Sequence, residues 1–326
     1  KRVHTVHNVA QKEQTKAGKT INGVLFQHFN VVPVALSEEI QRTIQEVYGL
    51  PDNRIPVVFN GIDLSRCIVK ESYARKDTFT VLHIGRFMDV KNHELLLRSF
   101  ARFKEHHSDA RLQLLGDGEL KENMMQLAGQ LNITDAVEFA GLQSNVYPWL
   151  HNADVFILPS KFEGMPMTLI EAMGTGLPII ASDVGGIPDM LMDQKDALLI
   201  APKEENILVA LESIYSDEEK RKRLGRNAWD KSAVFSAITM AKKYADIYEN
   251  ISLMKCLFVA SSMNFGGAER VMSILSNAWC DKGCEVKILL TGTAAKSNYA
   301  LKSQVELLSC YSEKKMGIPH IVIIRA

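Results

Sequence analysis

The stretch ADVFILPSKFEGMPMTLIEAMGTG, residues 153–176, decides the fold of this 326-residue chain. Residues 155–158 are an uninterrupted apolar run that ends at a proline, which predicts a strand buried in a parallel sheet. Pro166 suits the first position of a helix, and Gly174 and Gly176 predict where that helix ends. A buried strand that leads through a loop into a helix indicates an α/β fold.

The beginning of this predicted helix offers backbone amides to an anion. Gly164 loosens the loop before it, and the amides of the first turn have no partner within the helix. With the helix dipole, they predict a phosphate site at the mouth of the sheet. The amides concerned belong to Met167, Thr168 and Leu169.

Two glutamates flank these amides, Glu163 on the loop and Glu171 inside the helix. Carboxylates repel a bare phosphate, but they accept hydrogen bonds from hydroxyl groups, which sugars and riboses offer in numbers. The alternative for either glutamate alone is a solvated side chain or an ordinary charge in an early helical turn. The pair, together with the preceding strand and the glycine–proline loop, favours hydroxyl binding.

Two basic residues follow the strand predicted over residues 80–84. Arg86 lies at the tip of that strand, and Lys91 precedes a helix predicted over residues 92–107. Cations at a strand-to-helix turn suit a diphosphate, because they offset its charge as it departs as a leaving group. The alternative for both is a solvated surface position.

The glutamate pair resembles the Glu-x7-Glu motif of glycosyltransferase family 4, which comprises retaining enzymes of GT-B architecture that use sugar nucleotides. The resemblance continues through PIIASDVGGIPD, residues 178–189. It implies an α/β fold with two Rossmann-like, doubly wound parallel-sheet domains, the first one incomplete or rearranged. It also implies that Glu163 contacts hydroxyls of the transferred sugar and that Glu171 contacts the ribose.

The resemblance extends residue by residue to other positions. Arg86 and Lys91 match the family's Arg-x4-Lys pair, which binds the donor diphosphate, and His7 matches a histidine near the sugar. The turn at residues 60–63 matches the family's passage into the second domain. The implied catalytic residues are Glu163, His7, Arg86 and Lys91; the implied donor-binding residues are Glu171, Gly164, Met165, Met167, Thr168, Leu169, Phe139, Gly141, Gly266 and Gly267.

The end of the chain departs from the family's order. Residues 254–270 look like the start of a first domain, whose glycine loop would lie against donor and acceptor, yet they follow the second domain. Either the chain is circularly permuted, or it joins the end of one enzyme to the beginning of another. Residues 317–325 look like a second version of the strand at residues 3–7, which favours the joined account.

These patterns predict four segments. Residues 1–69 are the second half of an acceptor-type Rossmann domain, and residues 70–235 are a donor-type Rossmann domain. Residues 236–253 are a crossover helix and linker, and residues 254–326 are the first part of another acceptor-type domain. The chain begins with Lys1 rather than methionine, so this end is not expected to be a native start.

The composition limits the classes of partner and the cellular location that we expect for this chain. The formal net charge is +0, which argues against nucleic acid. Five cysteines without metal-ligand spacing indicate reduced thiols, and the absence of a long apolar run indicates a cytoplasmic protein. The basic run at residues 220–223 leaves peripheral contact with the inner face of a membrane as an alternative to a solvated helix face.

The leading functional hypothesis is hexosyl transfer from a UDP- or GDP-sugar to a glycan or lipid-linked acceptor, with retention at the anomeric carbon. No cofactor or metal is expected, because the sugar nucleotide is a substrate and fixed cations replace a metal. The alternatives are a fragment that binds nucleotide without turnover, a non-hydrolysing sugar-nucleotide epimerase, and a glycoside hydrolase that uses the two glutamates.

Overall fold

The computed structural model describes residues 2–6, 16–29, 31–74, 76–248, 255–264, 266–292 and 297–309. The chain divides into two compact units, Lys1–Met240 and Ala241–Ala326. This division is coarser than the four segments predicted above, whose boundaries stay a prediction.

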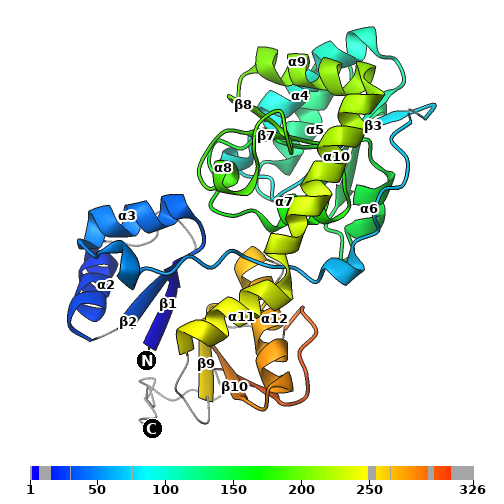
Figure 1. Ribbon diagram of the computed structural model, residues 1–326. Coiled ribbons are helices and arrows are strands. Elements are labelled where there is room, and N and C mark those ends of the chain that lie inside the picture. The colour runs from blue at the N-terminus through cyan, green and yellow to red at the C-terminus, as the bar shows by residue number, and fades with distance from the viewer. Residues whose placement is uncertain are drawn as a thin grey trace, which may run out of the picture. The chain divides into compact units, whose positions relative to one another are not determined.

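The first unit is built around a six-stranded, wholly parallel sheet with the order β5-β4-β3-β6-β7-β8. Helices cover both of its faces (Figure 1). Both faces of the sheet are therefore shielded from water. This explains why β6 is an unbroken apolar run whose four residues are all fully buried. The strands are β3 Phe79–Ile84, β4 Ala110–Leu115, β5 Val137–Gly141, β6 Val155–Leu158, β7 Ile179–Ser182 and β8 Leu198–Ile200.

The helices of this region pack in two groups. On one side α4 packs against α5 and α9, and on the other α7 packs against α6 and α10. Leu96, Phe100 and Phe103 of α4 recur at helical spacing and are fully buried in the core. The helices are α4 His93–His106, α5 Lys121–Gln130, α6 Tyr147–Asn152, α7 Met167–Gly174, α8 Ile187–Met190, α9 Glu204–Ser216 and α10 Glu218–Ser232, with 3-10 turns η3 Asp89–Lys91, η4 Thr134–Ala136 and η5 Ala233–Phe235.

The order of the strands reverses between β3 and β6. From β3 the chain proceeds outward through β4 to β5, and then returns to β6, which pairs with the other side of β3. In open α/β sheets, ligands bind at the carboxyl ends of the strands where the order reverses. The segments that leave β3 and β6 at that edge contain Arg86, Lys91 and Glu163.

The beginning of the chain forms a small parallel pair of strands, β1 Arg2–Val6 and β2 Val31–Ala35, with helices α2 Lys16–His28 and α3 Glu38–Tyr48. Ser37 caps α3 by accepting a hydrogen bond from the Ile40 amide, and Gly49 ends it in the left-handed conformation. The apolar run at residues 55–59 predicts a third strand, and this prediction is wrong. Only an isolated bridge joins Val57 to Ala35, and the 3-10 turn η1 Asp52–Arg54 precedes it.

The turn at residues 60–63 holds two segments of the first unit together. The Asn60 side-chain amide donates to the Met165 carbonyl oxygen at 3.3 Å, and Ile62 bridges to Ser236. Gly61 is required there, because a Cβ at this position would lie 2.4 Å from the Ser236 carbonyl oxygen. The 3-10 turn η2 Leu64–Arg66 follows, and then the polar segment that leads to β3.

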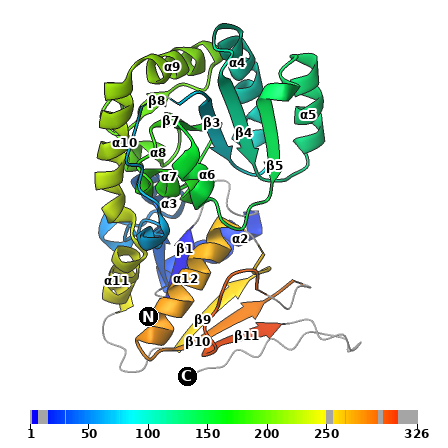
Figure 2. The ribbon, with the colours of Figure 1, turned by 90° about the vertical axis from the view of Figure 1, so that its right-hand side faces the viewer.

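The second unit contains a three-stranded parallel sheet of order β11-β10-β9, with helix α12 beside it (Figure 2). Trp279 of α12 stacks on Phe258 of β9, with ring centroids 5.3 Å apart. Parallel strands joined by a helix are a feature of Rossmann-like domains, and the assignment of this segment to the first part of such a domain stays a prediction. The elements are β9 Lys255–Ala260, α12 Gly267–Asp281, β10 Glu285–Leu290 and β11 Val305–Ser309; α11 Ala237–Tyr248 spans the junction between the units.

Within the described ranges, no helix combines the length and the apolar character that crossing a bilayer requires.

Candidate active site

The loops after β3 and β6 are bound to each other side by side. The Lys161 amide donates to the Val90 carbonyl oxygen at 2.8 Å, and the Asn92 side chain donates to the Pro159 carbonyl oxygen at 3.1 Å. Asn92 adopts a left-handed conformation with φ of 58°, which asparagine tolerates better than most residues. These bonds fix the two sequence motifs in one place at the switch point.

An ion pair joins the two motifs. Nζ of Lys91 lies 2.6 Å from Oε1 of Glu163, and the Ser160 hydroxyl donates to the same oxygen at 2.5 Å. Ser160 is fully buried and Glu163 is 8% exposed, so little water competes for these bonds. The structure therefore brings one predicted cation and one predicted carboxylate into direct contact.

Two buried histidines lie beneath this cluster. His83 of β3 bonds through Nδ1 to the Ile157 carbonyl oxygen of β6 at 2.8 Å, and its ring meets His93 edge to face. His93 stacks on Phe87 with ring centroids 4.1 Å apart. Burial, together with the nearby Lys91 ammonium, lowers the pKa of His83 to about 4 and that of His93 to about 2. Both rings are thus neutral near pH 7.

Arg86 extends from the tip of the same loop and is exposed. The backbone beside it is held closely, because the Gly85 amide donates to the Leu115 carbonyl oxygen at 2.9 Å. Gly116 passes so near that a Cβ there would lie 2.1 Å from the Gly85 carbonyl oxygen. The loop is therefore rigid at its base, while the Arg86 guanidinium can reach a ligand.

The beginning of α7 differs in detail from the prediction. Pro166 is the residue before the helix, with φ of −72° and ψ of 121°, and the first helical residue is Met167. The Leu169 amide donates to the Pro166 carbonyl oxygen at 3.2 Å, so it is not among the amides offered to an anion. The amides of Met167 and Thr168 remain as the predicted anion contacts.

Glu171 lies in the middle of α7 and is 1% exposed, whereas the prediction of ribose contact requires a reachable oxygen. The Met165 sulfur accepts a hydrogen bond from the Asn60 backbone amide at 3.0 Å. Gly164 is partly exposed at the turn between Glu163 and Met165. The roles of these residues stay predictions.

The predicted base pocket lies at the end of β5. Phe139 is partly buried and stacks toward Phe87 with centroids 6.0 Å apart. Gly141 takes a left-handed φ of 69°, and its carbonyl oxygen accepts from the Gly116 amide. Both residues are at the carboxyl edge of the sheet, and β4 and β3 lie between their strand and β6.

The glycine pair at residues 185 and 186 supports the glutamate loop. The Gly186 amide donates to the Glu163 carbonyl oxygen at 3.0 Å. Gly185 has a left-handed φ of 58°, and a Cβ on it would lie 1.8 Å from that same oxygen. The structure thus gives these glycines a packing role against Glu163 and Gly164.

Three predicted site residues lie outside the described part of the first unit. His7 lies outside the described residues. Gly266 and Gly267 belong to the second unit, where the Tyr299 hydroxyl donates to the Gly266 carbonyl oxygen at 2.8 Å. Gly266 precedes α12 and Gly267 begins it. Their contact with the donor stays a prediction.

Sequence reasoning missed the residues that support Glu163 and Lys91, above all Ser160 and His83. Ser160 directly follows the proline that ends β6, and His83 is a polar residue inside an otherwise apolar strand. A buried polar residue next to a predicted site was the available signal, but its partner could be found only in three dimensions.

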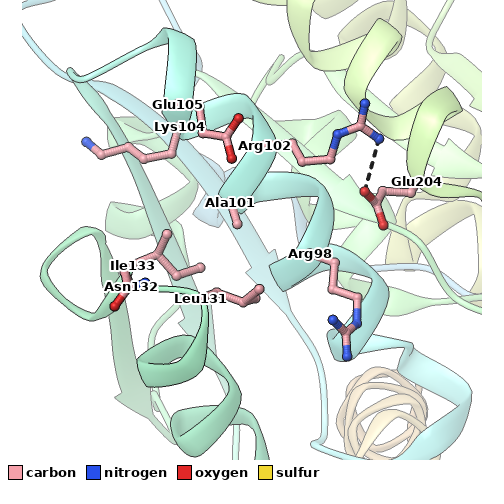
Figure 3. A pocket seen from close by; sticks show the side chains of 9 residues that line it. All are labelled: Arg98, Ala101, Arg102, Lys104, Glu105, Leu131, Asn132, Ile133 and Glu204. Atoms are coloured by element: carbon pink, nitrogen blue, oxygen red, sulfur yellow. Dashed lines mark hydrogen bonds and ion pairs between the residues drawn. The ribbon is translucent and has the colours of Figure 1, made fainter.

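A shallow groove elsewhere on the first unit has no predicted site residue in its lining. Figure 3 shows that Arg102 there is bonded to Glu204 of α9, at 3.0 Å. Its lining residues are Arg98, Ala101, Arg102, Lys104, Glu105, Leu131, Asn132, Ile133 and Glu204.

Both arginines of the basic run at residues 220–223 bond to backbone carbonyl oxygens of the fold. Arg221 is 4% exposed and donates to the carbonyl oxygens of Tyr73 and Ile214. Arg223 donates to the Gln194 carbonyl oxygen at 2.6 Å. The run thus offers fewer free charges to a lipid surface than its sequence predicts, and membrane contact stays a prediction. Over the described residues, no cluster of three or more His, Cys, Asp or Glu could hold a metal ion.

Comparisons with known proteins agree with this architecture. Residues 67–231, just over half of the chain, match the family model of glycosyl transferases group 1. The structure of HepE of Anabaena in complex with UDP and glucose superimposes with a TM-score of 0.68 at 18% identity, covering 76% of this chain and 71% of that one. The fold is therefore that of GT-B glycosyltransferases, as predicted. The chain belongs to the glycosyl transferases group 1 family.

Two curated relatives illustrate the similarity in sequence. An uncharacterized glycosyltransferase of Methanocaldococcus jannaschii is 31% identical over 166 residues, which cover 48% of this chain and 41% of that protein. The N-acetylgalactosamine-N,N'-diacetylbacillosaminyl-diphospho-undecaprenol 4-alpha-N-acetylgalactosaminyltransferase of Campylobacter jejuni is 29% identical over 199 residues, 60% of this chain and 53% of that protein. The chain thus spans only about half the length of these relatives.

Proposed function

We propose that this chain carries the donor site of a retaining glycosyltransferase, which moves a hexosyl group from a UDP- or GDP-sugar to a glycan or lipid-linked saccharide acceptor. One observation carries the proposal: at the switch point of the sheet, the Lys91 ammonium meets the Glu163 carboxylate at 2.6 Å, beside the first amides of α7. A site for diphosphate and a site for sugar hydroxyls are then adjacent.

The chemistry follows from these groups. The bond between the anomeric carbon and the diphosphate oxygen breaks, and the acceptor hydroxyl oxygen forms the new bond on the same face while its proton passes to the departing diphosphate oxygen. Negative charge develops on the departing diphosphate. Lys91, Arg86 and the amides of Met167 and Thr168 would stabilise that charge, because fixed donors aimed at developing charge are effective in a site with little water. Glu163 would hold the sugar through a hydroxyl.

The rest of the donor would lie on either side of the diphosphate. Glu171 would accept from the ribose hydroxyls, and Phe139 and Gly141 would line the base pocket. Since Glu171 is 1% exposed, ribose binding requires a small displacement of the side chains above it. His7 would order the sugar and the acceptor. No metal or other cofactor is proposed, since the cations of the chain would fill that role.

The names of relatives support the choice of donor and acceptor. UDP and glucose are bound in the HepE complex, and the acceptor in the name of the Campylobacter jejuni relative is a diphospho-undecaprenol saccharide. A second candidate is a donor-binding chain without turnover. It is favoured by one observation, that residues 254–270, which resemble the start of a first domain, follow the donor-type segment in the chain.

Calorimetric titration with UDP, GDP and their hexose conjugates tests the proposal. One of the two nucleotides is expected to bind. Glu171→Ala is expected to weaken its binding by roughly tenfold, which corresponds to the loss of one hydrogen bond to a charged group. Unchanged affinity in that variant, or no binding of either nucleotide, would contradict the donor site. Release of nucleoside diphosphate on addition of acceptor saccharides then separates transfer from binding alone.

A further inference from the structure

The carboxylate of Glu163 has unequal oxygens. Oε1 accepts from the Ser160 hydroxyl at 2.5 Å and from the Lys91 ammonium at 2.6 Å. A carboxylate oxygen has two lone-pair directions, so these two donors fill Oε1 and leave Oε2 as the acceptor for a further donor. An O–H···O⁻ distance of this size is typical of a strong, charge-assisted hydrogen bond.

The two donors differ in how firmly they can hold the carboxylate. Ser160 has a short, fully buried side chain, and it lies two residues after the end of β6 and three residues before Glu163. Lys91 is a flexible chain with a point charge, which can keep its attraction while the carboxylate rotates. The backbone of Glu163 is fixed independently by the Gly186 amide at 3.0 Å. The orientation of the carboxylate plane therefore depends on Ser160.

We infer that Ser160 is a positioning residue: by holding Oε1 of Glu163 it presents Oε2 to one hydroxyl of the donor sugar. This inference rests on the proposed function, because it gives Glu163 a sugar hydroxyl to bind. Its consequence concerns the sugar alone. A nucleoside diphosphate has no group at Oε2, so its affinity should not depend on Ser160.

The test compares two ligands on one variant. For the nucleotide that the wild-type chain binds, calorimetry measures Kd for the free nucleoside diphosphate and for its hexose conjugate. Ser160→Ala is expected to raise the Kd of the hexose conjugate by roughly fivefold to tenfold, because one charge-assisted bond to the sugar becomes misaligned. The Kd of the free nucleoside diphosphate is expected to change by less than about twofold. Ser99→Ala is the matched control, since it removes another fully buried serine hydroxyl, one that bonds within α4.

A double-mutant cycle separates positioning from general damage. In the Glu163→Gln background, Ser160→Ala is expected to have no further effect on the conjugate, because the carboxylate it orients is gone. The inference is overturned if Ser160→Ala weakens both ligands equally, if it leaves the conjugate unchanged, or if its effect persists with Gln at position 163. A wild-type chain that binds neither ligand would instead contradict the proposed donor site.

Discussion

Nζ of Lys91 lies 2.6 Å from Oε1 of Glu163, although 72 residues separate them in the sequence. The contact joins the loop after β3 to the loop after β6, and the two side chains are 18% and 9% exposed. Such a pair lies between the exposed pairs that contribute little to stability and the buried pairs whose disruption costs several kcal/mol. It also means that Lys91 is held beside the Glu163 carboxylate, the group proposed to bind the sugar.

Removing the Lys91 ammonium should therefore affect both stability and binding. Lys91→Ala leaves the Glu163 carboxylate largely buried with one fewer cation, and we expect the free energy of unfolding to fall by about 1–3 kcal/mol. Urea denaturation measures this change. Lys161→Ala is the control, because Lys161 pairs with Asp89 at 2.5 Å on the exposed side of the same loops. A Lys161→Ala variant as unstable as Lys91→Ala would argue against a special role for the buried pair.

Gly185→Ala should displace the glutamate loop. Its φ of 58° strains any other residue, and its Cβ would lie 1.8 Å from the Glu163 carbonyl oxygen, so the loop must move. We expect a loss of roughly 3 kcal/mol, seen as a lower melting temperature, together with weaker binding of the sugar nucleotide. Gly49→Ala separates strain from contact, since Gly49 has a φ of 64° but no atom within 4 Å of the added Cβ. Equal losses in the two variants would contradict a packing role for Gly185.

The buried histidines predict a dependence of stability on pH. Burial lowers the pKa of His83 to about 4 and that of His93 to about 2, below the value of 6.5 for an ordinary histidine. Below pH 6.5 the unfolded chain therefore binds protons that the folded chain does not, and the free energy of unfolding falls as the pH is lowered toward 4. Each histidine contributes a slope of at most about 1.4 kcal/mol per pH unit.

Unfolding curves of His93→Phe between pH 4 and 7 measure this contribution. Phenylalanine keeps the stacking on Phe87 and has no titrating group, so we expect a flatter slope than in the wild type. His106→Gln, which removes an exposed histidine of the same helix, should leave the slope unchanged. A His93→Phe variant with the wild-type slope would show that His93 is protonated in the folded chain at these pH values.

Local patterns predicted the parts of this fold that depend on short-range physics. The apolar run at residues 155–158 became β6, and the helix predicted over residues 92–107 became α4. The start of α7 was misplaced by one residue, because proline suits both the position before a helix and its first turn. The strand expected at residues 55–59 failed because β-propensity does not guarantee a neighbour with which to pair.

The site was predictable only in outline. Spacing and resemblance pointed to Glu163 and Lys91, but their contact depends on which strand lies beside β3, and that order is a property of the whole sheet. Ser160 and His83 act through partners on other segments, so their roles could not be read from local sequence. The positions of Arg86 and Glu171 relative to a ligand are still predictions.

A crystal structure of the chain with the nucleoside diphosphate it binds tests the central claim most directly. We predict that the diphosphate oxygens lie within hydrogen-bonding distance of the Arg86 guanidinium, the Lys91 ammonium and the amides of Met167 and Thr168. A nucleotide found away from the loops that follow β3 and β6, for instance in the groove lined by α4 and residues 131–133, would contradict the account.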